Sequence, residues 1–213
     1  MSGILQGEAV AVLVETEYIP FELDHYRRFF ESQGARVDFM ANLWGKNSMK
    51  IIGDITDTEK PETAIHTMTV KKDVGKCNPN DYAIVLIAAN YVACRLREIP
   101  PMFSLGGVDR LRTPPAVRFY ASAMMNKDIV KGALCHGLWI LTPTPELLAG
   151  RKVICHTVVL ADVHNAGGVF VPDPSHVVVD DDLVTARSAG DLDAYTEALL
   201  ATYRKLRNRK HPV

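Results

Sequence analysis

Two continuous apolar runs constrain the fold of this chain more than any other feature. They are "AVAVLVE" at residues 9–15 and "DYAIVLIAAN" at residues 81–90. Side chains alternate between the two faces of a sheet, so an unbroken apolar run is typical of a strand that is buried on both faces. Such strands occur in parallel sheets that helices cover on both sides. The two runs therefore predict an α/β fold around a mainly parallel sheet.

The rest of the chain alternates between strand and helix patterns. Pro20 opens a helical pattern with Phe21, Tyr26, Phe29 and Phe30 on or near one face, and Gly34 is a plausible end. The later segments predict a strand in "ARVDFMA", a strand at 66–73, a helix from about Pro115 to Lys127, a strand in "KGALC", a strand at 151–159 running into a helix in "LADVHNAG", a hairpin turning on Asp180–Asp182, and a closing helix in "DLDAYTEALLATYRKL". This order predicts a three-layer α/β sandwich with helices on both faces of the sheet.

The chain shows no internal boundary, and we expect one domain over residues 1–213. Residues 91–115 hold four prolines and a Gly-Gly pair, which indicates an inserted loop within that domain. Loops of this length are often functional or lie at interfaces. The stretch "IPPMFSLGG" is apolar enough that we expect a second subunit to bury it, in a homo-oligomer that is a dimer or larger.

Composition and charge exclude several classes of protein. The 213 residues carry a net charge of -1, which gives no electrostatic footprint for nucleic acid or an anionic membrane. No apolar run approaches the roughly 18 residues of a membrane span, and the N-terminal residues lack a signal-peptide pattern. The four cysteines form no C-x-x-C pair, which predicts unpaired thiols in a reducing cytoplasm. Cys155, His156 and His164 do not have a standard zinc spacing, so we expect neither a metal nor a cofactor.

The segment "KGALCHGLWIL" at residues 131–141 is the strongest candidate for chemistry. A buried strand is expected to end at Leu134 and a helix to begin near Gly137, which places Cys135 at the turn between them. At such an elbow the side chain is pushed out above the sheet, and the N–H groups of the next helix favour an anion there. A thiolate is such an anion, so we expect a lowered Cys135 pKa. Gly137 has no Cβ, which would let the helix approach the strand closely.

These residues resemble a known family. "GALCHGLWIL" is similar to the nucleophile elbow of the ThiJ/PfpI superfamily, the class I glutamine-amidotransferase-like proteins, and in particular to its PfpI intracellular-protease branch. Residues 12–39, "DYAIVLIAAN" and two stretches of the C-terminal third resemble other parts of that family. The resemblance implies a flavodoxin-like sandwich with a nucleophile elbow.

The resemblance also implies roles for individual residues. Cys135 matches the nucleophile and His136 the histidine that follows it, while His156 falls where several members place a further pocket histidine. Glu17 matches the loop glutamate that hydrogen-bonds the thiol, and is expected to be protonated; Glu15 ranks second. The backbone N–H groups of Ala89 and His136 would form the oxyanion hole.

Two departures from the family pattern bear on activity. Ala88–Ala89 replaces the family's Gly-Gly turn, and alanine keeps the N–H groups but restricts the backbone. The glutamate that the protease branch lends from a neighbouring subunit falls near Ala93, and the nearest acid is Glu98 in the expected loop. The resemblance therefore does not by itself imply a complete peptidase triad.

Two functions remain open. The first is a cysteine-dependent enzyme that acts on an amide, a peptide or a small carbonyl compound such as a glyoxal, with Cys135 as nucleophile. The alternative is a redox or stress sensor, or a chaperone-like protein, in which Cys135 is oxidised without turnover. Both need an accessible thiol with a low pKa, so the sequence does not separate them.

Overall fold

The computed structural model describes residues 3–54, 65–100 and 107–210. Seven strands form the main sheet in the order β10-β11-β7-β6-β1-β2-β5. Its strands are β1 (Ala9–Leu13), β2 (Arg36–Ala41), β5 (Lys72–Asp73), β6 (Ile84–Ile87), β7 (Val130–Leu134), β10 (Val177–Asp180) and β11 (Leu183–Ala186). Neighbouring strands are parallel, except that β10 runs antiparallel to β11 in the predicted hairpin. The apolar runs at residues 9–15 and 81–90 form β1 and β6, and every residue of both strands is buried.

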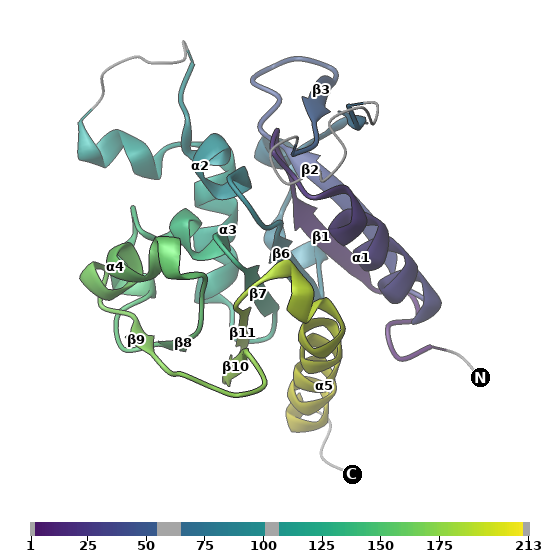
Figure 1. Cartoon of the computed structure of the whole chain (residues 1–213). Helices are drawn as coiled ribbons and strands as arrows, with labels where there is room; N and C mark the ends of the chain where they lie inside the picture. Colours follow the sequence, from purple (N-terminus) through teal and green to yellow (C-terminus); the bar gives the residue numbers. More distant parts are fainter. Residues whose placement is uncertain (1–2, 55–64, 101–106, 211–213) are drawn as a thin grey trace.

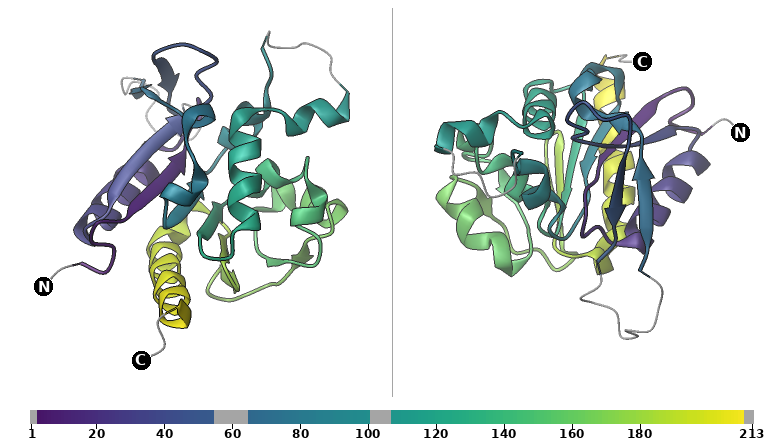
Figure 2. Two further views of the ribbon diagram at one scale, coloured as in Figure 1. Left: turned by 180° about the vertical axis from the view of Figure 1, so that it is seen from behind. Right: turned by 90° about the horizontal axis from the view of Figure 1, so that it is seen from above.

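Helices cover both faces of this sheet. Within the described ranges, the α-helices are α1 (Pro20–Ser32), α2 (Val92–Arg97), α3 (Pro115–Met125), α4 (Thr157–Asn165) and α5 (Leu192–Lys210). Figures 1 and 2 show α1 and α5 together on one side of the sheet, with α3 and α4 on the other. The predicted three-layer sandwich is therefore confirmed, with a sheet whose central strands are buried on both faces.

The ends of α1 and α5 follow the local chemistry of their sequences. Pro20 occupies the first turn of α1, where its missing N–H costs no hydrogen bond, and Gly34 follows the helix at φ +88°. Before α5, the side chain of Asp191 accepts the backbone N–H of Ser188 in a capping box. These features confirm the predicted bounds of both helices to within a few residues.

Two predictions about elements need correction. The strand expected over residues 151–159 is only β8 (Lys152–Val153), which pairs with β9 (Val169–Phe170) outside the main sheet. The backbone N–H of Ile154 donates to the Thr185 side chain, so the apolar run leaves the ladder there. Within residues 91–115, expected to be irregular, the structure forms α2 and a 3₁₀ helix, Val108–Arg112. A second small sheet pairs β3 (Met49–Ile52) with β4 (Thr67–Val70).

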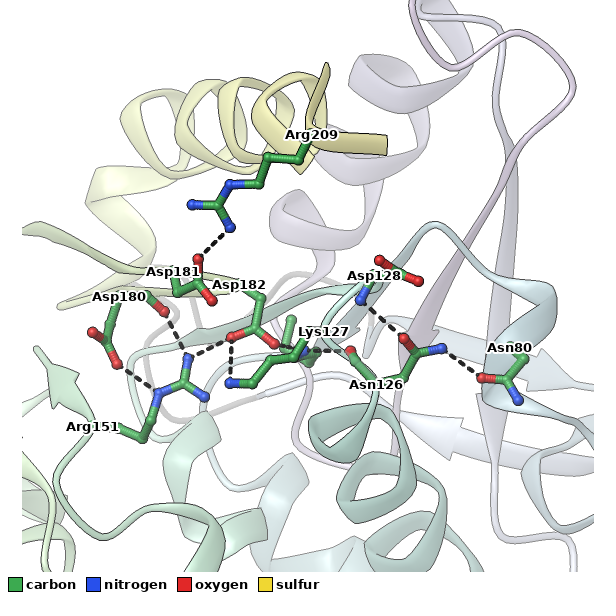
Figure 3. Close-up of polar contacts among 10 residues, drawn as sticks. Asn80, Asn126, Lys127, Asp128, Arg151, Asp180, Asp181, Asp182 and Arg209 are labelled. Carbon is green, nitrogen blue, oxygen red and sulfur yellow. Dashed lines mark hydrogen bonds and ion pairs between the residues drawn. The ribbon is translucent and has the colours of Figure 1, made fainter. Parts of the chain in front are cut away.

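A buried ion cluster lies where β7 begins, at the opposite end of that strand from Cys135. The side chains of Lys131 and Asp182 are fully buried and paired, and Arg151 donates to Asp182 at 2.8 Å. Figure 3 shows Arg151 between Asp180 and Asp182, with Arg209 on the neighbouring Asp181. Burial lowers the pKa of the Lys131 ammonium, and the carboxylate of Asp182 acts against that shift. The cluster joins β7 to the β10–β11 hairpin.

Candidate active site around Cys135

Cys135 occupies a strained turn directly after β7. Its φ is +58°, in the left-handed region that non-glycine residues rarely adopt. The backbone holds it there: its N–H donates to the Ala186 carbonyl at 2.9 Å, and its own carbonyl accepts the His156 N–H at 3.1 Å. A strained cysteine between a buried strand and a following turn is the geometry of a nucleophile elbow.

Gly137 explains how the turn fits over the sheet. A Cβ built on Gly137 would lie 2.7 Å from the Ile87 Cγ2 atom, closer than real Cβ contacts allow. The expected close approach is therefore confirmed. The helix expected to begin near Gly137 is a 3₁₀ helix of five residues, Gly137–Leu141. A helix this short contributes only a small dipole to the stabilisation of a thiolate.

Aromatic and imidazole rings gather beside the elbow. The ring of His136 lies 5.3 Å from Tyr91, 5.2 Å from Trp139 and 4.9 Å from His156, measured between centroids. His136 is buried, with 8% of its surface exposed. The structure thus brings together the two predicted histidines.

His156 is fixed by its place at the start of α4. It is the residue before the helix, and its Nδ1 accepts the backbone N–H of Val158 at 3.2 Å. A nitrogen that accepts carries no proton, so this hydrogen bond places the proton of the neutral ring on Nε2. The ring of Trp139 lies next to His136, and its indole N–H donates to Asp162 of α4.

Glu17 is engaged differently from the expected role. Its carboxylate accepts hydrogen bonds from Nε and Nη2 of Arg95 at 3.0 and 3.1 Å, and Arg95 also donates to Glu98 at 3.1 Å. These residues line a cavity of about 330 Å³ together with Tyr91 and Cys94. Both carboxyl oxygens of Glu17 therefore accept from Arg95, whereas the expected role requires this carboxyl to donate to the thiol. Glu15, ranked second, accepts the backbone N–H of Thr16, and burial raises its pKa.

A different acid, Glu22, lies beneath the site. It is fully buried on α1, and its two carboxyl oxygens accept the Ala89 N–H at 3.0 and 3.1 Å. Ile87 pairs with Ala133 in the β6–β7 register, so continuing that register by two residues brings Ala89 beside Cys135. Burial raises the pKa of Glu22 from 4.5 to about 7, although the Ala89 hydrogen bond opposes the shift. Glu22 is therefore a carboxylic acid that keeps its proton close to neutral pH.

The position of Glu22 also affects the expected oxyanion hole. The N–H of Ala89, one of the two predicted donors, points at the Glu22 carboxyl. An N–H that is already engaged does not aim at a substrate oxygen, so Ala89 does not have the expected geometry here. The sequence signal for Glu22 is helical spacing: residues 22, 26 and 30 share the buried face of α1, and a glutamate on such a face is unusual.

The other cysteines have less reactive surroundings. None of the four cysteines, all of which lie within the described residues, forms a disulfide. Burial raises the pKa of Cys155 to about 12, with a further contribution from Cys135 nearby. Burial also raises the pKa of Cys77 and of Cys94. Each of these thiols is thus held in its unreactive form.

The described residues contain neither a candidate metal centre nor a candidate membrane-spanning helix. Among them, no group of three or more histidine, cysteine and acidic side chains could hold a metal ion. No helix within the same ranges has the length and apolar character needed to cross a membrane.

Comparison with known proteins finds similarity over the part of the chain that contains the site. The DJ-1/PfpI family matches residues 104–202, the part of the chain that contains the elbow. The uncharacterized protein SAV1875 of Staphylococcus aureus (strain Mu50) is 25% identical over 193 residues, covering 90% of this chain and 95% of its own. The uncharacterized protein SH1084 of Staphylococcus haemolyticus is 26% identical over 198 residues, covering 90% of this chain and 95% of its own.

Solved structures share the fold at low sequence identity. The two-domain protein of Anabaena variabilis with DJ-1/ThiJ/PfpI-like and ferritin-like domains superposes with a TM-score of 0.72 at 22% identity, covering 91% of this chain. This chain spans about half of that protein, 47% of its length. The ThiJ/PfpI domain protein of Brachyspira murdochii gives a TM-score of 0.71 at 12% identity, covering 94% of this chain and 98% of its own. These likenesses establish the flavodoxin-like fold.

Proposed function

We propose that this chain is a cysteine-dependent enzyme of the DJ-1/PfpI type, because the DJ-1/PfpI family model matches residues 104–202 and the chain shares the fold of a ThiJ/PfpI domain protein. Its substrate is an amide, a peptide or a small carbonyl compound. The observation that carries the proposal is the strained φ of +58° at Cys135, next to two imidazole rings. Strain of this kind is retained where a function requires the side chain to be presented.

Each residue near Cys135 has a distinct part in the proposed reaction. The thiolate of Cys135 attacks the carbonyl carbon and forms a carbon–sulfur bond, while the carbonyl π electrons move to oxygen. The backbone N–H of His136 stabilises that oxyanion. With an amide or a peptide, the oxyanion collapses and the carbon–nitrogen bond breaks, while His136 or His156 gives a proton to the leaving amine. A histidine later takes a proton from the water that hydrolyses the thioester, which releases the acid product and returns the Cys135 thiolate. Glu22, protonated near neutral pH, replaces Glu17 as the carboxyl that donates to the thiolate.

One observation favours a second function. The Ala89 N–H is engaged by Glu22, which leaves the predicted oxyanion hole with one of its two donors. A redox sensor needs no oxyanion hole. It requires only an accessible thiolate that peroxide converts stepwise to sulfenic and then sulfinic acid. We therefore keep oxidation of Cys135 without turnover as the rival function.

A substrate panel separates the two. Amides, peptides and glyoxals are offered to the native protein, to Cys135→Ser and to the matched control Cys77→Ser. Turnover in the native protein and in Cys77→Ser, lost in Cys135→Ser, supports the enzyme. No turnover in any of the three, with stepwise peroxide oxidation at Cys135 seen by mass spectrometry, supports the sensor. Turnover that survives in Cys135→Ser contradicts both.

A further inference from the structure

A pair of buried tyrosines lies behind Glu22. Tyr26 follows Glu22 by one turn of α1, and Tyr195 comes from α5, which packs against α1. Their ring centroids are 6.4 Å apart, and both side chains are fully buried. Neither hydroxyl has a hydrogen-bond partner within the described part of the chain. Two orphan hydroxyls side by side are uncommon, because native proteins pair nearly all of their buried polar groups.

The Tyr26 hydroxyl lies near the Glu22 carboxyl. Its contact with the Glu22 carboxyl is close enough to lower the pKa of that acid, but it falls outside the geometric limits of a hydrogen bond. The groups that face Glu22 are the Tyr26 hydroxyl on α1, Tyr195 on α5 and the Ala89 N–H at the end of β6, and Cys135 lies within electrostatic range of Tyr26. Burial raises the pKa of Tyr26 well above its ordinary value, so the phenol stays neutral and can only donate or accept a hydrogen bond.

The energetic penalty of burying the Tyr26 hydroxyl without a hydrogen-bond partner indicates that this hydroxyl has a function. A buried hydroxyl without a partner destabilises the folded state, whereas phenylalanine would fill the same space without that penalty. A small rotation of the Tyr26 side chain would turn its O–H into a donor to an ionised Glu22. A protonated Glu22 has less need of that donor, because its charge is gone.

We propose that Tyr26 is a positioning residue that sets the proton affinity of Glu22 and thereby controls the thiol chemistry of Cys135. The link to Cys135 rests on the proposed function; the link between Tyr26 and Glu22 does not. In the ionised state of Glu22 the Tyr26 hydroxyl donates to the carboxylate and stabilises its charge. In the protonated state the carboxyl is held by the Ala89 N–H alone and its own O–H is available to the Cys135 thiolate.

Infrared difference spectroscopy of the protonated carboxyl measures the effect of Tyr26 on the Glu22 pKa directly. The Glu22 signal is identified as the band lost in Glu22→Gln, and it is followed with pH in the native protein and in Tyr26→Phe. We expect Tyr26→Phe to raise the Glu22 pKa by about half to one pH unit, the loss of one neutral donor to the charged form. The matched control is Tyr120→Phe, which removes an equally buried hydroxyl that donates to the Gly132 carbonyl, and it should leave the Glu22 titration unchanged.

A second readout distinguishes this inference from the proposed function. The pH dependence of Cys135 alkylation by iodoacetamide is measured in the same variants. A Glu22 shift together with a shifted alkylation profile supports both links. A shifted Glu22 pKa with an unchanged pH profile of Cys135 alkylation supports the effect of Tyr26 on Glu22 and refutes its control of Cys135. An unchanged Glu22 titration in Tyr26→Phe overturns the inference whatever Cys135 does.

A third measurement covers the case in which Tyr26→Phe does not fold. Replacing all tyrosines with 3-fluorotyrosine in a Tyr120→Phe background makes every phenol a stronger donor without changing its shape. The Glu22 pKa is then expected to fall, and an unchanged value would again overturn the inference.

Discussion

At the scale of single residues, Glu22 is the finding that sequence reasoning missed. The acidic loop "ETE" directs the comparison with the family toward Glu17, which the structure instead pairs with Arg95. Helical spacing alone marks Glu22, because it shares the buried face of α1 with Tyr26 and Phe30. Cys135, His136 and His156, by contrast, could be selected from sequence, since the strand that ends at Leu134 fixes where the turn must lie.

The two glutamates make opposite predictions for the thiol. Glu22→Gln is expected to raise the Cys135 pKa, because a neutral amide donates to the thiolate more weakly than a protonated carboxyl does. Glu17→Gln should leave that pKa unchanged, since its carboxylate is paired with Arg95. Thiolate ultraviolet absorbance, titrated as each protein minus its Cys135→Ser form, measures both. If Glu17→Gln changed the Cys135 pKa and Glu22→Gln did not, Glu17 and not Glu22 would be the carboxyl that donates to the thiolate.

Glu22 also makes stability depend on pH. Its folded-state pKa of about 7 lies above the ordinary 4.5, so between these values the native state holds a proton that the unfolded state releases. The free energy of unfolding should therefore fall as pH rises through that window, by up to about 3 kcal/mol, and stay level above it. Urea unfolding of the native protein compared with Glu22→Gln at about pH 4.5 and pH 7.5 checks this. Parallel pH dependence of the two proteins would show that Glu22 is not held protonated by the fold.

At the scale of elements, continuous apolar runs and helical periodicity predict most of the sheet and its long helices. These patterns predict a strand wrongly where an apolar segment is buried without pairing to a neighbouring strand. Residues 154 and 155 are buried, yet the strand ends at Val153. The patterns fail again at α2, because the prolines that follow it make its surroundings resemble a loop. Burial can be predicted from composition, whereas the hydrogen-bond partner of each backbone group depends on the fold.

The buried ion cluster at the start of β7 gives a prediction at this scale. Asp182→Asn should lower the free energy of unfolding by about 3–5 kcal/mol, because it leaves Lys131 and Arg151 without their common carboxylate. Asp181→Asn, the matched control in the same hairpin, removes only an exposed pair with Arg209 and should cost less than about 1 kcal/mol. Urea unfolding at neutral pH measures both, and equal losses would contradict a special role for the buried cluster.

At the scale of the whole molecule, the order of strands assembles the site. Glu22 at the start of α1, Ala89 after β6 and Cys135 after β7 are far apart in sequence, and the neighbouring positions of β1, β6 and β7 in the sheet place them at the same edge. The carboxyl ends of parallel strands are where α/β folds place their chemistry. A single sequence predicts the alternation of strands and helices but not this spatial order, so the contact between Glu22 and Ala89 could not be predicted from it.

The proposal of a homo-oligomer also belongs to this scale. The apolar stretch that motivates it lies at residues 99–107, of which residues 101–106 fall outside the described ranges. We expect light scattering at micromolar concentration to give the mass of a dimer or a larger assembly. A monomeric mass would contradict the proposal and would leave that stretch without the cover we infer for it.

The central claim is that Cys135 is the reactive thiol of this protein, and limiting alkylation tests it most directly. Native protein is treated with substoichiometric iodoacetamide at about pH 6.5, where only a thiol with a lowered pKa reacts quickly, and the labelled cysteine is identified by peptide mapping. Cys135 should be labelled first, since burial raises the pKa of Cys77, Cys94 and Cys155. Labelling of Cys77 or Cys94 before Cys135 would contradict the claim.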